Sequence, residues 1–135
     1  MKRNPARIYT AISGIFLLLQ GVSTLTARLY PPFDQAFPAL LTITQMIPPH
    51  STLHILTGIL AVAVLVRGGE RGALWFAAGF GLFYTALATY GMLTMQATLF
   101  GLQPFDHPFH YLLGIAGLLT AGIQTYRARR EDTQP

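Results

Sequence analysis

The chain has 135 residues, of which 52% are hydrophobic and only 10% are charged. Soluble domains carry roughly 25% charged residues, so this composition lacks the charged surface of a soluble domain and predicts lipid as the solvent. Cysteine is absent, which excludes disulfides and thiolate metal sites. The net charge is +4, but the basic residues flank apolar stretches instead of alternating with aromatic residues. We therefore expect no nucleic-acid partner.

Four apolar stretches follow one another along the chain. A hydrocarbon core of roughly 30 Å requires about 20 helical residues. The stretches cover approximately residues 8–29, 50–66, 73–96 and 108–126, and the second is at the short limit for a span. The first has the basic flank of a signal peptide, but it is too long and no convincing cleavage site follows it. We therefore expect one integral membrane domain over residues 1–135.

The connections between these stretches predict how the helices are arranged. The first connection is the longest, and its apolar middle is too short to span, so we expect a short interfacial helix there. Residues 67–72 predict a tight glycine-rich turn. Short connections make neighbouring helices antiparallel, so the expected fold class is all-α, a four-helix transmembrane up-down-up-down bundle.

The basic residues predict the orientation in the membrane. Eight of the nine basic residues lie on one side of the predicted bundle, and Arg28 lies on the other side. The eight are Lys2, Arg3, Arg7, Arg67, Arg71, Arg127, Arg129 and Arg130. By the positive-inside rule both termini are cytoplasmic, and the starts of the second and fourth spans face outward. An aromatic belt is predicted at the two boundaries, with Tyr9, Trp75 and Tyr126 at the inner one and Tyr30 and Tyr111 at the outer one.

All four histidines lie in two similar segments at those outward-facing starts. Residues 50–61 read HSTLHILTGILA, and residues 106–119 read DHPFHYLLGIAGLL. His54 and His110 are each followed four residues later by a glycine, Gly58 and Gly114 respectively. This pattern predicts two repeated helical hairpins, related by an axis along the membrane normal.

Three interpretations of the histidines remain open. His50 and His54 share one helix face, and diagonal helices would bring His54 and His110 to a similar depth. The imidazoles could be hydrogen-bonded packing residues, or groups that titrate near neutral pH. They could also form a site for zinc, copper or haem b, with His54 and His110 as first ligands and further groups from His50, His107 and Asp106.

The remaining polar and small residues favour helix packing. Ser13, Gln20 and Thr24 form one stripe on the first span, where Thr85, Thr89 and Tyr90 could pair with Gln20. A polar lining for a permeation path is the alternative, but we favour packing. Packing is also the role expected for Thr57, Gly58, Gly114 and Gly117. No charged residue lies deep in a span, which argues against an ion-coupled transporter.

Sequence patterns typical of catalysis are absent: there is no supported Ser-His-Asp set, no phosphate-binding glycine loop and no HExxH. We expect a non-enzymatic structural or accessory membrane protein without a cofactor, acting as a homo-oligomer or within a larger membrane complex. The alternatives are the histidine-ligated haem or metal protein and, third, a small channel or transporter.

The segment LFGLQPFDHPFHYLLGIAGLL, with the earlier HSTLHILTGILAV, resembles a family of small bacterial four-helix membrane proteins classed among the domains of unknown function. The matching residues are His54, Gly58, Asp106, His110 and Gly114. The resemblance implies a location in the bacterial inner membrane and no assigned activity.

Overall fold

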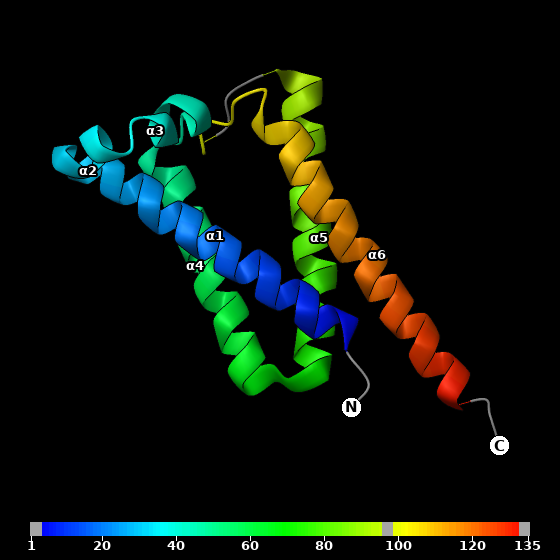
Figure 1. The fold of residues 1–135 in the computed structure, drawn as a ribbon. Helices are drawn as coiled ribbons and strands as arrows, with labels where there is room; N and C mark the ends of the chain where they lie inside the picture. Colours follow the sequence, from blue (N-terminus) through cyan, green and yellow to red (C-terminus); the bar gives the residue numbers. More distant parts are fainter. Residues whose placement is uncertain (1–3, 96–98, 133–135) are drawn as a thin grey trace.

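The computed structural model describes residues 4–95 and 99–132, and these residues form an all-α fold (Figure 1). Three helices are long: α1 (Pro5–Leu29), α5 (Gly69–Thr94) and α6 (Asp106–Asp132). Helix α4 (Pro48–Ala63) continues into the π-helical turn η1 (Val64–Gly68). Two short helices, α2 (Pro31–Ala36) and α3 (Ala39–Thr44), lie between α1 and α4.

Local sequence explains where α1 begins and ends. The Asn4 side chain accepts a hydrogen bond from the backbone N–H of Arg7 at 3.0 Å, and Pro5 occupies the first turn, where no N–H is needed. Pro31 ends α1 but also begins α2. The first connection therefore holds two short helices instead of the one expected, because Pro38 separates them.

The reversal between α4 and α5 is tighter than the predicted turn at residues 67–72. Gly69 has φ 58°, a left-handed conformation that glycine adopts without a steric cost. The residues after it already belong to α5, since Glu70 and Arg71 are good helix formers.

Helix boundaries also differ from the expected spans where proline is involved. Helix α4 begins at Pro48 instead of residue 50, and α6 begins at Asp106 instead of residue 108, because proline is compatible with a first helical turn. Helix α6 also runs past residue 126 to Asp132, through a charged segment of good helix formers. Residue 96, the expected end of the third span, lies outside the described residues, as do Lys2 and Arg3.

The four main helices α1, α4, α5 and α6 pack as two pairs, α1 with α4 and α5 with α6, and α1 also contacts both members of the second pair. These four helices alternate in direction along the chain (Figure 1). The described ends of the chain and the Gly69 turn lie at one end of the molecule, and α2, α3 and the start of α6 lie at the other.

A glycine brings the backbones of each pair close together. A methyl group on Gly58 would lie 2.9 Å from the Gly14 carbonyl oxygen of α1, and one on Gly114 would lie 2.9 Å from the Gly81 carbonyl oxygen of α5. The glycine that follows each His-x-x-x-Gly histidine therefore meets the backbone of the preceding long helix in both pairs. This shared contact supports an internal repeat of two hairpins.

The outward faces of the helices are strongly apolar. Ile12, Leu19, Leu82 and Leu112 are each at least 63% exposed, whereas soluble proteins rarely expose large contiguous apolar patches. Among the described residues, two helical stretches are long and apolar enough to cross a membrane, Pro5–Leu29 and Pro48–Thr94. The second stretch consists of α4, η1 and α5.

We predict that Gly58→Ala lowers the free energy of unfolding by about 1–3 kcal/mol, because the added methyl would lie 2.6 Å from the Leu18 Cβ. Gly79→Ala is the matched control. Its methyl meets nothing within 4 Å, and alanine is the better helix former by up to about 1 kcal/mol. Thermal unfolding in detergent, followed by circular dichroism, measures both, and equal stability of the two variants would contradict the packing role of Gly58.

Candidate functional site

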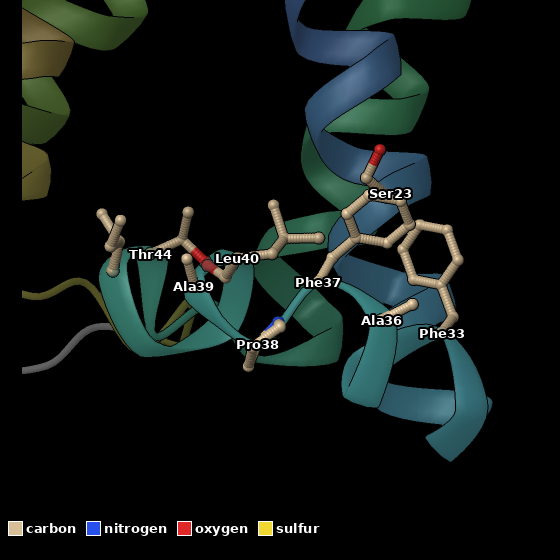
Figure 2. A pocket seen from close by; sticks show the side chains of 9 residues that line it. Ser23, Phe33, Ala36, Phe37, Pro38, Ala39, Leu40 and Thr44 are labelled. Carbon is tan, nitrogen blue, oxygen red and sulfur yellow. The ribbon is translucent and has the colours of Figure 1, made fainter.

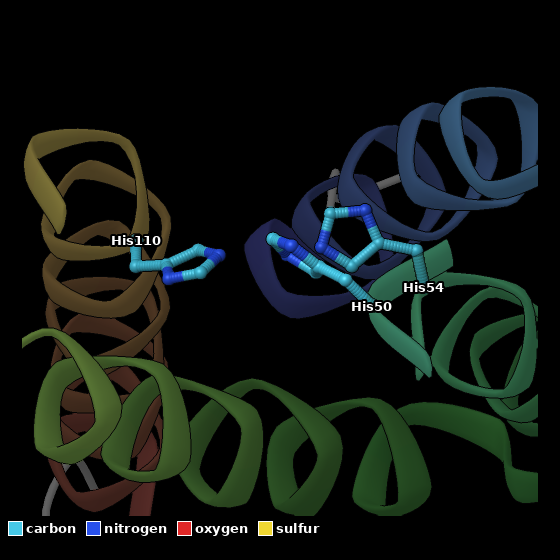
Figure 3. Close-up of side chains that lie close together, drawn as sticks. All are labelled: His50, His54 and His110. Atoms are coloured by element: carbon cyan, nitrogen blue, oxygen red, sulfur yellow. The ribbon is translucent and has the colours of Figure 1, made fainter. Parts of the chain in front are cut away.

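Two helices bring three imidazoles together (Figure 3). His50 and His54, on the first two turns of α4, have ring centroids 4.6 Å apart. His110 projects from α6 toward both, at 5.6 Å from His50 and 6.3 Å from His54. One ring nitrogen of each can be chosen so that all three lie within 4.8 Å of one another. We call these residues the histidine triad.

The histidine triad is buried, and most of its ring nitrogens have no hydrogen-bond partner in the described part of the chain. Each of the three residues is 1% exposed. Both ring nitrogens of His50 and of His54, and Nδ1 of His110, have no hydrogen-bond partner among the described residues. Burying a polar group without a partner costs roughly 1–3 kcal/mol, and buried polar groups are nearly always paired. A cluster of this kind is expected to serve a bound ligand.

Asp106 adds a carboxylate at the edge of the triad. Its Oδ2 lies 3.9 Å from His50 Nδ1 and accepts a hydrogen bond from the backbone N–H of Gln103 at 2.7 Å. Asp106 begins α6 and is only 8% exposed.

The fourth histidine, His107, is also buried, with only 6% of its surface exposed. It nevertheless lies outside the triad. Its ring occupies the space in which a side chain at Gly91 of α5 would lie. The structure thus brings together three of the four candidate histidines and places the fourth against a neighbouring helix.

Tyr84 and Ser51 lie near the triad or next to one of its residues in the chain, and the sequence alone did not single out either of them. The Tyr84 ring lies edge-on to His110 at 4.9 Å and stacks on Phe80 at 4.2 Å. Beside His50, the Ser51 hydroxyl is hydrogen-bonded to the Thr24 hydroxyl of α1 at 2.8 Å. The sequence signal for Ser51 was its position beside a histidine at a helix start, whereas nothing distinguished Tyr84 from other aromatic residues.

The polar stripe of α1 is used mostly in packing. Ser13 donates to the Tyr9 carbonyl at 2.8 Å, and Thr24 bonds Ser51 on α4. Gln20 does not pair as proposed: its Oε1 is buried without a hydrogen-bond partner among the described residues, and Thr89 instead bonds Tyr111.

Thr57 and Gly117 were also expected to serve in packing. The Thr57 hydroxyl donates to the Leu53 carbonyl at 2.8 Å within α4, so this bond does not link two helices. A methyl on Gly117 would lie 2.8 Å from both the Tyr9 hydroxyl oxygen and the Ala77 carbonyl oxygen. Gly117 therefore allows close approach to two neighbouring helices.

A pocket of about 710 Å³, separate from the histidine triad, lies between the end of α1 and the short helices α2 and α3 (Figure 2). Phe33, Phe37 and Leu40 contribute to its apolar lining, and its hydroxyl groups come from Ser23 and Thr44. None of its lining residues is titratable. The histidine triad is therefore the stronger candidate for chemistry.

The family described as "Domain of unknown function (DUF4383)" matches residues 7–126, which include the histidine triad. The chain belongs to this family. The expected resemblance to a family of unknown function is thus confirmed, and DUF4383 carries no activity in its description. No curated protein and no solved structure matches the chain.

The unsatisfied nitrogens give a stability prediction for the DUF4383 fold. In the presence of a chelator, His54→Leu is expected to raise the free energy of unfolding by about 1 kcal/mol or more, because it removes two unpaired buried nitrogens. If His54 were a hydrogen-bonded packing residue, the same change would cost about 1 kcal/mol. Thr24→Val is the control: it removes a formed bond and should cost about 0.6 kcal/mol. Equilibrium unfolding in detergent gives the free energy of unfolding of the wild type, His54→Leu and Thr24→Val.

Proposed function

We propose that this protein is a four-helix integral membrane protein that binds a late transition-metal ion through His50, His54 and His110. The observation that carries the proposal is the convergence of three buried imidazoles with unpaired nitrogens, contributed by two helices. Imidazole suits zinc, copper, nickel and iron. The proposal assigns binding and no catalytic reaction.

The spacing of the nitrogens fits one ion after a small adjustment. Zinc–nitrogen bonds of 2.0–2.1 Å place two ligands of a tetrahedral ion about 3.4 Å apart. The triad nitrogens lie within 4.8 Å, so side-chain movements on the order of 1 Å would complete the site. Three histidines with one further position is a common zinc arrangement, and zinc is therefore the first ion to test.

The arrangement does not suit haem b. A haem held by His54 and His110 would need its porphyrin in the plane between the two rings. The His50 ring lies 4.6 Å from one and 5.6 Å from the other and occupies that region. Tyr84 further closes the space beside His110.

The membrane part of the proposal rests on the surfaces of the helices. Large apolar side chains are exposed along the long helices, and two stretches satisfy the length and hydropathy of a span. Trp75 and Tyr126 are 67% and 59% exposed near the basic end, as membrane-boundary residues would be. The second stretch contains α4 and α5, which run in opposite directions and would make two crossings. With α1 this gives three spans, and we propose α6 as the fourth.

The basic residues then suggest the orientation and the location. We place both termini and the Gly69 turn in the cytoplasm of a bacterial cell, by the positive-inside rule. This orientation puts the histidine triad near the outer face of the inner membrane. Any ion would then reach the triad from outside the cytoplasm.

Purified protein is expected to bind one zinc or cobalt ion per chain, with each of His50→Ala, His54→Ala and His110→Ala weakening binding. Each loss should exceed the 10–100-fold cost of removing a group that only orients a ligand. His107→Gln is the matched control, because this buried histidine lies outside the triad, and it should bind like the wild type. Titration against a competing chelator measures the affinities, and wild-type protein without stoichiometric binding would disprove the proposal.

The absence of cysteine makes the orientation directly testable. Gln35→Cys, on α2, should react with a membrane-impermeant maleimide in intact cells. Arg71→Cys, beside the Gly69 turn, should react only after the membrane is permeabilised. Reversed labelling would contradict the proposed orientation, and labelling of both residues in intact cells would contradict the membrane-spanning arrangement.

A further inference from the structure

We propose that Asp106 is the positioning residue of the metal site and acts through His50. In this role the carboxylate accepts a hydrogen bond from Nδ1–H of His50, which leaves Nε2 of that ring to bind the ion. The inference rests on the proposed metal-binding function, and it names the group on which the affinity of the triad depends.

The geometry around His50 supports this role. Asp106 Oδ2 lies 3.9 Å from His50 Nδ1, so the carboxylate is on the Nδ1 side of the ring. The two atoms are too far apart for a hydrogen bond, and a movement of about 1 Å would bring them within bonding distance. A movement of similar size is needed to draw the triad nitrogens onto one ion. Movements of about 1 Å would therefore complete the contacts of both ring nitrogens of His50.

Asp106 is itself held in place. The Gln103 N–H bonds its Oδ2 at 2.7 Å, and the residue begins α6 one turn before His110. The carboxylate is therefore fixed to the helix that supplies the third ligand while it faces a ligand on α4. Histidines that bind metals almost always donate their second ring N–H to such a group, which fixes the tautomer and the ring orientation.

Charge supports the same assignment. Three neutral imidazoles leave the full charge of a divalent ion in a buried site, and an uncompensated buried charge is costly. Asp106 is nearly buried and contributes one negative charge at the edge of the triad. The Asp106 carboxylate would thus partly compensate the charge of a bound cation without acting as a fourth protein ligand.

The test is a cobalt titration of purified protein, with a competing chelator and the visible spectrum of the bound ion as readouts. Asp106→Asn is expected to weaken cobalt binding 10–100-fold. The band shape should remain that of the wild type, because the three nitrogen ligands are unchanged. Asp34→Asn, on α2, is the matched control and should change the affinity less than twofold.

A double-mutant cycle separates positioning from general structural damage. In a His50→Ala background, Asp106→Asn should have almost no further effect on cobalt affinity, since its partner ring is gone. Wild-type affinity in Asp106→Asn, an equal loss in both backgrounds, or an altered band shape that marks Asp106 as a direct ligand would each overturn the positioning role. If the wild type itself does not bind cobalt or zinc, the proposed metal function fails instead.

Discussion

The close contact between helix backbones at glycine is the constraint on which the rest of the structure depends. Gly58 lies against Gly14 of α1, and Gly114 lies against Gly81 of α5. Each of these glycines is one turn from a triad histidine, so the contact sets the depth and the rotation of the helix that carries the imidazole. A larger side chain at either glycine would push apart the helices that position the site.

Much of the fold could be predicted from the sequence, because long apolar stretches separated by proline and glycine leave few arrangements. The observed helices differ from the expected spans where proline begins a helix: Pro31 lies in the first turn of α2 and Pro48 in the first turn of α4. The extension of α6 to Asp132 was also missed, since a charged segment carries no apolar signal although its residues form helices well.

The candidate site was predictable in part. Side chains four residues apart on a helix differ by about 40° in direction, so His50 and His54 were expected on one face. The sequence favours His110 over His107 as a first ligand, because a glycine follows His110 four residues later. A spacing of three separates the directions of these two side chains by about 60°. The rotation of α6 then decides which of the two faces the triad. That rotation depends on the contact of Gly114 with α5. The His-x-x-x-Gly pattern marks the face of α6 that carries Gly114, but the sequence of α6 alone does not show that this face meets α5.

The three imidazoles of the triad are divided unequally between the two helix pairs. Two imidazoles come from the α1–α4 pair and one comes from the α5–α6 pair. All three imidazoles could bind one ion only while the two helix pairs remain in contact. A bound ion would therefore cross-link the α1–α4 pair to the α5–α6 pair. Conversely, a slight parting of the two pairs would remove one of three bonds and loosen the ion. Ion binding and association of the two helix pairs would therefore be coupled equilibria, each favouring the other.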